Sequence, residues 1–204
     1  MLRFLTAGES HGKNLTVIVE GIPANLPLTE GYIEVHMARR QVGYGRGGRM
    51  LIEKDRAEIL SGVRHGLTLG SPISMLIVNR DWATGKGPDG VPWIDEMSIS
   101  PSDVPFEPIT NLRPGHADTP GIAKYMQKDA RNILERSSAR ESAARVAAGA
   151  LAKRFLEEFG IEVRGHVLCI GGVHAEPSES VNWDTLEETP YHRENIEGSK
   201  MAAV

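Results

Sequence analysis

The segment Ser138–Phe159 constrains the fold more than any other, because it carries a helix start, an apolar stripe and a helix stop. Ser138-Ala139-Arg140-Glu141 has the pattern of a capping box, in which serine and glutamate side chains cap each other's backbone N–H groups. Gly160 stands where a C-terminal cap is expected. Between them, apolar residues recur at helical spacing: Ala143, Val146, Ala147, Ala150, Leu151 and Phe155. We therefore predict a helix whose alanine-rich face packs closely against a sheet or another helix.

The rest of the chain mixes strand-like segments with one further helix signal. Thr29-Glu30 opens a predicted helix that runs to about Arg40. Short polar or glycine-bearing turns separate the apolar segments between 50 and 78, which predicts an antiparallel meander there. The predicted strands are Leu15–Val19, Met50–Glu53, Ala57–Val63, Ile73–Val78 and, after the long helix, Ile161–Ile170. Periodicity thus indicates mixed helix and strand content without fixing an architecture.

Charge and cysteine content exclude several classes of protein. A net charge of −4 argues against a general nucleic-acid binder, which usually carries a basic excess. The single cysteine, Cys169, excludes an internal disulfide framework, fits a reducing cytoplasm and is predicted to be a small buried hydrophobe. No apolar run approaches the roughly 18 residues that span a bilayer, and Met1–Thr6 is too short for a signal peptide. We expect a soluble, globular, cytoplasmic protein with no membrane partner.

Two segments have the texture of loops. Asn79–Leu112 contains five prolines and scattered glycines, which predicts a long ordered loop or insertion. Val173–Val204 is also polar and loop-like, but its end, Ser199–Val204, resembles the first turns of a helix that has been cut off. We therefore expect the chain to be unfinished at its C-terminal end.

The first cluster of candidate functional residues is Gly8-Glu9-Ser10-His11-Gly12. Two glycines bracket a carboxylate, a hydroxyl and an imidazole, so the backbone can approach a ligand closely while polar groups face it. A polar turn between two strands, with His11 hydrogen-bonded locally, explains the same residues equally well. Spacing alone leaves both interpretations open.

The second cluster, Arg39–Arg49, contains four arginines and four glycines. The planar guanidinium group suits bidentate binding of phosphate or carboxylate, so this segment is a candidate anion site. A solvated basic loop is one alternative. An arginine–glycine RNA-binding segment is another, although this stretch is short and embedded in an acidic chain.

The third cluster is Arg113-Pro114-Gly115-His116-Ala117-Asp118, where a Pro-Gly turn presents His116 between a cation and a carboxylate. Asp118 is positioned to orient the imidazole, and Arg113 to hold an anion beside it. A structural turn with a satisfied histidine remains the alternative. A fourth feature, Arg136–Arg140, sets hydroxyls and two guanidinium groups at the predicted helix N-terminus, which favours an anion.

Other common site motifs are absent from the sequence. Gly85-Lys86-Gly87 lacks the spacing of a phosphate-binding loop, and neither a Gly-x-Ser-x-Gly elbow nor a dinucleotide fingerprint occurs. No His-Glu-x-x-His pair is present and one cysteine cannot build a cysteine-rich metal site, so we expect no metal. The clusters together suggest an anionic ligand met by arginines, with two histidines available for proton transfer.

Three of these segments, in this order, resemble the signature segments of the chorismate synthase family: Gly8–Gly12, Arg113–Asp118 and Arg136–Glu141. The resemblance runs from Met1 to about Gly172. It implies an α+β fold of helices packed with antiparallel sheets, in a homotetramer. It also implies conversion of 5-enolpyruvylshikimate 3-phosphate to chorismate and phosphate by a 1,4-anti elimination that needs reduced FMN. Some members of the family reduce the flavin themselves with NADPH.

The resemblance also implies roles for individual residues. His11 corresponds to the histidine near reduced flavin, Ser10 supports its proton network, and His116 protonates the leaving phosphate. The implied substrate-binding arginines are Arg40, Arg46, Arg113 and Arg140, of which Arg40 and Arg46 are also associated with NADP. The implied FMN-contacting residues are Arg136, Ser137 and Ser138.

The family's members are considerably longer, and their second half supplies further FMN contacts and another acidic catalytic residue. We therefore expect residues 1–204 to hold part of the site and to turn over little substrate alone. A non-catalytic protein that retains an anion- or flavin-binding surface is the leading alternative, and RNA binding through Tyr44–Arg49 is a more remote one.

Overall fold

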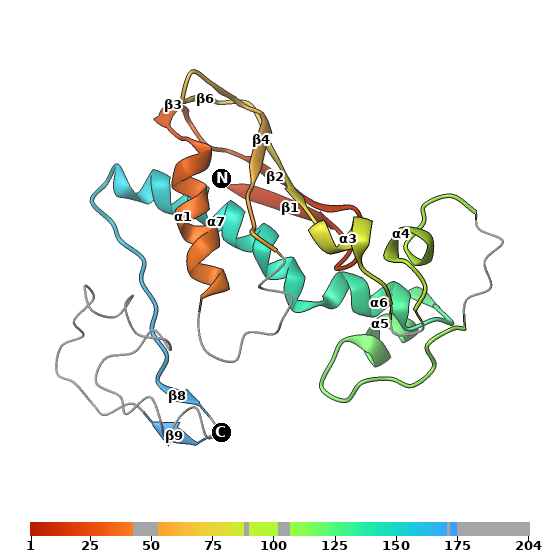
Figure 1. The fold of residues 1–204 in the computed structure, drawn as a ribbon. Coiled ribbons are helices and arrows are strands. Elements are labelled where there is room, and N and C mark those ends of the chain that lie inside the picture. The colour runs from red at the N-terminus through yellow and green to blue at the C-terminus, as the bar shows by residue number, and fades with distance from the viewer. Residues whose placement is uncertain (43–52, 88–89, 102–106, 171, 175–204) are drawn as a thin grey trace.

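A computed structural model describes residues 1–42, 53–87, 90–101, 107–170 and 172–174, and its strands form antiparallel sheets (Figure 1). The four-stranded sheet has the order β1 (Arg3–Gly8), β2 (Asn14–Glu20), β7 (Ile73–Val78), β4 (Glu58–Ser61). The three-stranded sheet has the order β3 (Ala24–Pro27), β6 (Leu67–Leu69), β5 (Val63–Arg64). The two-stranded sheet pairs β8 (Cys169–Ile170) with β9 (Val173–His174).

The helices differ greatly in length and position. The two longest, α1 (Glu30–Gln41) and α7 (Ser142–Glu157), lie side by side against the four-stranded sheet (Figure 1). The shorter helices gather beyond one end of this sheet: α3 (Arg80–Thr84), α4 (Trp93–Glu96), α5 (Asp118–Tyr125) and α6 (Arg131–Ser137). A 3₁₀ turn, η1 (Ala139–Glu141), joins α6 to α7. Helices packed with antiparallel sheets confirm the α+β class.

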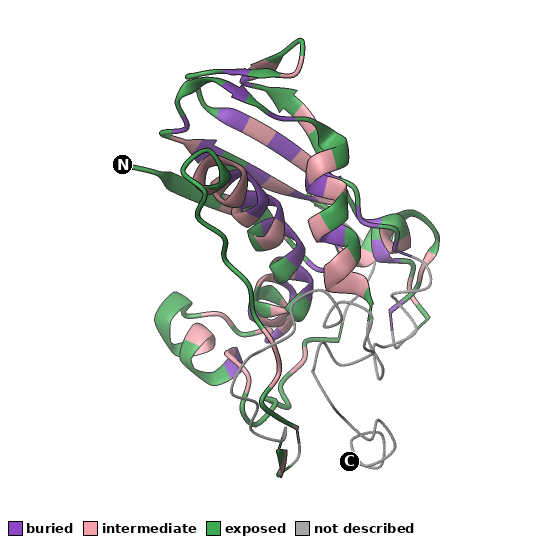
Figure 2. Cartoon of the chain, turned by 90° about the vertical axis from the view of Figure 1, so that its left-hand side faces the viewer, coloured by how far each residue is buried: buried purple, intermediate pink, exposed green. Residues whose placement is uncertain are grey.

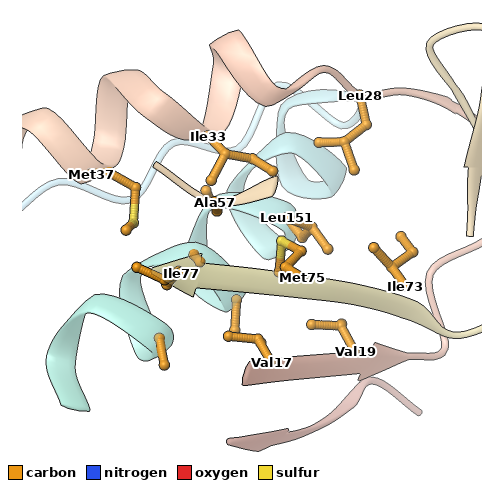
Figure 3. Packing of buried hydrophobic residues seen from close by; sticks show 14 of the residues in the cluster. Val17, Val19, Leu28, Ile33, Met37, Ala57, Ile73, Met75, Ile77 and Leu151 are labelled. Carbon is orange, nitrogen blue, oxygen red and sulfur yellow. The ribbon is translucent and has the colours of Figure 1, made fainter. Parts of the chain in front are cut away.

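The main core lies between the four-stranded sheet and the two long helices. Alternate residues of β2 and β7 point toward α7, where Leu151 packs against them, and α1 contributes Ile33 and Met37 (Figure 3). Figure 2 shows the buried residues of the helices and the sheet facing each other. Full burial of one such aliphatic side chain contributes about 1.5–3 kcal/mol. This core fixes the sheet and α7, from whose ends the candidate site is built.

The alanine-rich face predicted for the long helix is confirmed. Ala143, Ala147, Ala150 and Leu151 are buried in α7, and Gly160 has the positive φ (+68°) of a helix-terminating residue. The predicted start is displaced, however, because Ser138 caps the 3₁₀ turn η1 and α7 itself begins at Ser142.

The reciprocal capping box is not formed. Ser138 Oγ accepts a hydrogen bond from the backbone N–H of Arg140. The Glu141 carboxylate faces β1 instead of capping Ser138, and it accepts hydrogen bonds from Thr6 and Arg136. A charged partner outside the helix therefore takes the glutamate side chain away from its local role.

The helix predicted from Thr29 is confirmed as α1. Thr29 Oγ1 accepts a hydrogen bond from the Tyr32 N–H over 3.2 Å, and the helix ends at Gln41. Strands are confirmed over Leu15–Val19 and Ile73–Val78 as β2 and β7.

The predicted meander is confirmed in part, because the predicted strands Ala57–Val63 and Ile73–Val78 pair antiparallel as β4 and β7. β7 lies between β2 and β4, while the intervening β5 and β6 fold away to join β3 in the second sheet. The strand predicted over Met50–Glu53 is described only at Glu53, and Glu53 lies outside any strand. Residues 50–52 lie outside the described residues, and Glu53 is a buried carboxylate that accepts the backbone N–H groups of Arg80 and Asp81.

Two predictions for the segment after α7 are also wrong. The strand predicted over Ile161–Ile170 is reduced to Cys169–Ile170, because residues 161–168 have no paired strand in the described chain. Ile161 and Leu168 are exposed for the same reason. Cys169 is exposed as well, rather than buried.

The loop or insertion predicted over Asn79–Leu112 contains α3 and α4 among its described residues, most of which lie outside helices and strands. Residues 88–89 and 102–106 of this loop lie outside the described residues, as do 175–204 with the predicted cut-off helix. Within the described ranges, no helix is both long and apolar enough to cross a membrane.

Candidate active site

Gly8 shapes the turn that carries the first candidate histidine. Its φ is +101°, in the region that favours glycine, and a Cβ there would lie 2.2 Å from the carbonyl oxygen of Asn14 on the neighbouring strand. The glycine is therefore explained by the close approach of β1 and β2, and it fixes where the chain leaves β1.

The turn itself is held from two sides. Asn79 Nδ2 donates to the carbonyl oxygens of Glu9 (2.9 Å) and Gly12 (2.7 Å). The Ser10 N–H donates to the carbonyl oxygen of Glu135 in α6 over 2.9 Å, and Ser10 is buried. These contacts leave the turn little freedom, so the residue between Ser10 and Gly12 is presented in a defined orientation.

His11 is enclosed by side chains from three helices. Its backbone N–H donates to Glu135 Oε2 (2.9 Å), and its Nδ1 lies 3.0 Å and 2.9 Å from the two Glu135 oxygens. The indole of Trp93 in α4 stacks on the imidazole with ring centroids 3.9 Å apart and an interplanar angle of 15°. Asp81 Oδ2 in α3 lies 4.0 Å from Nε2. The imidazole is still a quarter exposed, so a ligand can reach it.

The carboxylate of Glu135 is almost completely buried. Burial alone would raise the pKa of this group, but the hydrogen bonds and positive charge of His11, with the nearby Arg131, hold the pKa below its ordinary value. Arg131 Nη1 lies 3.3 Å from Glu135 Oε1, and its Nε is paired with Glu96. Glu135 is therefore an ionised acceptor beneath the histidine at neutral pH.

The second histidine lies just before α5 and also contacts a buried carboxylate. His116 Nδ1 is 2.5 Å from Asp118 Oδ1, and Asp118 is fully buried. Arg113 donates to Asp118 through its backbone N–H (3.0 Å) and its Nε (3.2 Å). These hydrogen bonds from Arg113 outweigh the effect of burial and, with the bond from His116, lower the pKa of Asp118 to about 2.

Helix α6 connects the two histidine sites. Its Glu135 holds His11, and its Ile133 supports the helix that begins at Asp118, because Gly121 of α5 packs on Ile133 so closely that a Cβ would lie 2.3 Å away. The two histidines predicted from the sequence thus belong to neighbouring elements with one shared support.

The predicted substrate arginines Arg40 and Arg140 meet at a buried carboxylate. Asp55 Oδ2 lies 3.2 Å from Arg40 Nη1, and Asp55 Oδ1 is paired with Arg140 Nη1. Arg140 also donates through Nε to Asn79 Oδ1 (2.8 Å), and its Nη2 lies 3.6 Å from Glu53 Oε2. Arg140 is only 4% exposed, so its guanidinium group is held by protein acceptors in this arrangement.

The predicted cofactor-binding residues lie where α6 ends, rather than at the N-terminus of the long helix. Arg136 is in the last turn of α6 and donates to the carbonyl oxygen (2.8 Å) and hydroxyl (2.7 Å) of Thr6. Ser137 is exposed at the end of the same helix, and Ser138 begins η1. The remaining predicted residue, Arg46, lies outside the described residues.

Three important residues of the site were not identified from the sequence: Asn79, Asp55 and Glu135. Asn79 directly follows the apolar strand Ile73–Val78, and a polar residue at the end of a buried strand is a usable signal. Glu135 had a weaker signal, as a carboxylate just before the Arg136–Glu141 motif. In the part of the chain that the structure describes, no three His, Cys, Asp or Glu side chains are grouped to hold a metal ion.

Fold and site together define an α+β protein with two carboxylate-bound histidines near clustered arginines, an arrangement suited to proton transfer beside an anion. A family model described as chorismate synthase matches residues 2–202. The chain belongs to the chorismate synthase family.

Similar proteins support this assignment. The chorismate synthase of Aquifex aeolicus (strain VF5) is 62% identical over 98% of this chain and 49% of its own length. That of Moorella thermoacetica is 57% identical over 100% of this chain and 51% of its own length. A crystal structure of chorismate synthase is similar in fold, with a TM-score of 0.68 and 44% identity, over 94% of this chain and 48% of that one. The chain spans about half the length of these relatives.

Proposed function

We propose that this chain carries one half of the active site of a chorismate synthase. That enzyme is a lyase that converts 5-enolpyruvylshikimate 3-phosphate to chorismate and phosphate. In this reaction a C–O bond to phosphate and a ring C–H bond break, and a new ring double bond forms. The observation that carries the proposal is the pair of histidines, each in contact with a buried carboxylate, at Glu135 and Asp118. Such pairs suit the two proton roles that the elimination requires.

His116 is proposed to protonate the departing phosphate. Asp118 contacts its Nδ1, which orients the ring. The guanidinium group of Arg113 lies 3.1 Å from the same imidazole through Nη2, where it adds positive charge for the phosphate. His11 is proposed to lie beside the cofactor, with Ser10 supporting its turn.

Reduced FMN, when bound, supplies electron density transiently without net redox change. Arg136, Ser137 and Ser138 are the proposed contacts in this chain, and their chemistry fits one edge of such a group. The Arg136 side chain is 37% exposed and Ser137 is exposed, which suits a phosphate or carbonyl oxygen. Binding through Arg136 requires sharing or exchange with Glu141 and Thr6, which accept hydrogen bonds from its guanidinium group. Arg136, Ser137 and Ser138 are proposed to bind and orient the FMN. The remaining FMN contacts are proposed to come from the half of the relatives that this chain does not cover.

Arg40, Arg46, Arg113 and Arg140 are proposed to bind the trianionic substrate. If Arg40 and Arg140 bind the substrate, the substrate must share them with Asp55 or displace it, because both arginines contact the Asp55 carboxylate. We also propose NADPH as a reductant bound near Arg40 and Arg46, a homotetrameric assembly and a cytoplasmic location, all by analogy with the family.

A hybrid protein tests the proposed function. Residues 1–204 are joined to the second half of the Aquifex aeolicus relative, and chorismate formation is measured anaerobically with reduced FMN. We expect the hybrid to form chorismate, and the same hybrid carrying His116→Asn to lose most of its turnover. His65→Asn is the matched control, because His65 is exposed in a turn with φ +51°, which asparagine tolerates.

The alternative, a non-catalytic flavin- or anion-binding protein, predicts a different result in the same experiment. The hybrid would then bind FMN or substrate and form no chorismate. Turnover that is equal in the His116→Asn and His65→Asn hybrids would contradict the proton-donor role of His116.

A further inference from the structure

The contact between His11 and Glu135 determines which nitrogen of the imidazole carries a proton. Both carboxylate oxygens lie within 3.0 Å of Nδ1, and one of them also accepts the His11 backbone N–H. An ionised carboxylate can only accept hydrogen bonds, so the contact requires a hydrogen on Nδ1. The lowered pKa of Glu135 keeps that carboxylate ionised at neutral pH.

The His11 imidazole is contacted on its face as well as at its Nδ1 edge. Trp93 stacks on the imidazole at 3.9 Å between centroids, and Trp93 is itself buried. The guanidinium group of Arg131 lies 5.4 Å from the centre of the Trp93 ring and 3.3 Å from Glu135, so it supports both partners of the histidine.

The opposite ring nitrogen is in a different position. Nε2 of His11 lies 4.0 Å from Asp81 Oδ2, beyond hydrogen-bond distance, and the His11 side chain is a quarter exposed. The charged groups around the ring are thus Glu135 and Arg131 from α6 and Asp81 from α3, with Glu96 of α4 paired to Arg131. Only Nδ1 is bound by a carboxylate at hydrogen-bond distance among these contacts.

We propose that Glu135 and Trp93 are positioning residues that hold His11 as its Nδ1–H tautomer, so that Nε2 is the atom that exchanges a proton in the reaction. The direction of that exchange rests on the proposed function, whereas the tautomer does not. Neutral His11 accepts a proton at Nε2, and the imidazolium returns it from the same atom while Glu135 stabilises the charge. The proposal gives the loop Asn79–Leu112 a role, since it supplies Trp93.

Nitrogen NMR of the ¹⁵N-histidine-labelled chain tests the tautomer directly. The His11 signals are assigned by their loss in His11→Asn. Spectra are recorded at a pH high enough for the imidazole to be neutral. We expect Nδ1–H as the single tautomer in the wild-type chain. Glu135→Gln, which keeps the shape, and Glu135→Ala, which removes the acceptor, are both expected to lose it and give an Nε2–H or mixed population. Glu157→Gln is the control, because Glu157 contacts Tyr32 and Arg154 instead.

Two results would overturn the proposal. The first is an Nε2–H tautomer in the wild-type chain, a measurement that does not depend on whether any variant folds. The second is an unchanged Nδ1–H tautomer in Glu135 variants whose circular dichroism matches that of the wild type.

The role of Trp93 has its own readout. In the wild-type chain, the indole ring current is expected to shift the carbon-bound protons of His11 upfield, because Trp93 stacks on the imidazole. Trp93→Leu is expected to remove this shift, whereas Trp82→Leu, in α3 and near Lys13, is expected to retain it. Retention of the shift in Trp93→Leu would exclude the stacking role.

The hybrid enzyme separates the inference from the proposed function. If both hold, Glu135→Gln in the hybrid lowers kcat about 10-fold or more while KM changes little, as expected for a residue that orients a general acid or base. If the hybrid forms no chorismate, the proposed function fails while the tautomer result stands. If the hybrid is active but Glu135→Gln leaves kcat unchanged, the positioning role fails alone.

Discussion

His116 and Asp118 are two residues apart, and Nδ1 of the histidine lies 2.5 Å from Oδ1 of the aspartate. The turn before α5 brings them together, and it leaves the carboxylate fully buried while a quarter of the imidazole remains exposed. One partner therefore faces the protein and the other faces the site. This division lets Asp118 set the orientation of a group that a ligand can still reach.

Replacing Asp118 by asparagine should separate orientation from binding. In the hybrid enzyme we expect Asp118→Asn to lower kcat about 100-fold, within the range for loss of an oriented general acid. The KM for substrate should change much less, because Arg113 is retained. Steady-state kinetics check this, and equal changes in kcat and KM would show that Asp118 acts in binding.

The lowered pKa of Asp118 also predicts how stability depends on pH. The pKa falls from the ordinary 3.8 to about 2 on folding, so the ionised carboxylate stabilises the fold above about pH 4 and this contribution is lost as the pH falls toward 2. Urea unfolding between pH 2 and pH 6 should show a smaller loss in Asp118→Asn than in the wild-type chain. An identical slope in both proteins would show that another group titrates.

Asp55 is expected to be important for stability because it contacts two arginines while fully buried. Asp55→Asn should lower the free energy of unfolding by about 3–5 kcal/mol, since Arg40 and Arg140 lose their shared counter-charge. Glu34→Gln breaks the exposed pair with Arg56, so it should cost at most about 1 kcal/mol. Denaturant titration of both variants checks the difference. Similar losses of unfolding free energy would show that the buried carboxylate of Asp55 stabilises the fold no more than the exposed one of Glu34.

Gly8 should tolerate no side chain. Gly8→Ala places a Cβ against the Asn14 carbonyl at positive φ, and it should destabilise the chain by more than about 2 kcal/mol. Gly66→Ala is the matched control, because Gly66 has φ +76° and no atom within 4 Å of an added Cβ, so its cost is the backbone strain of about 1 kcal/mol. Thermal unfolding should rank the two in this order, and the reverse order would contradict the close approach of the strands.

The core against α7 gives a prediction of packing. Leu151→Ala leaves a cavity between the helix and the four-stranded sheet, and it should cost about 2–5 kcal/mol. Leu168→Ala, at an exposed position, should change stability by less than about 0.5 kcal/mol. Urea midpoints with unchanged m-values would confirm both, and a small effect of Leu151→Ala would place the core elsewhere.

The features that could be predicted from the sequence are those that a local pattern determines. The alanine-rich face of α7 follows from spacing within one helix, and the Thr29 cap follows from adjacent residues. The strand predicted over Ile161–Ile170 could not be tested by a local pattern, because a strand forms only where another segment pairs with it. The apolar residues of 161–168 show the pattern of a strand, but no strand among the described residues pairs with them.

The sequence predicts the contact of His116 with Asp118, but it does not predict two other carboxylates of the candidate site, Glu135 and Asp55. Asp118 lies two residues from His116, so their contact follows from a short turn. Glu135 is 124 residues from His11, and no local pattern connects them. The same holds for Asp55 and Arg140, which are 85 residues apart. Burial of Arg140 against such distant acceptors is a property of the tertiary fold, which the spacing of residues along the chain does not show.

Helices α6 and α7, which are separated by the extended residue Ser138 and the 3₁₀ turn η1, limit where the chain length can vary. Glu135 and Arg136 project from α6 at angles set by that helix, and α7 is anchored by Leu151 in the core. One added residue would rotate everything on one side of it by about 100° relative to the other. An insertion or deletion inside α6 or α7 should therefore disturb the candidate site or the core more than one at an irregular position of Asn79–Leu112 away from Trp93.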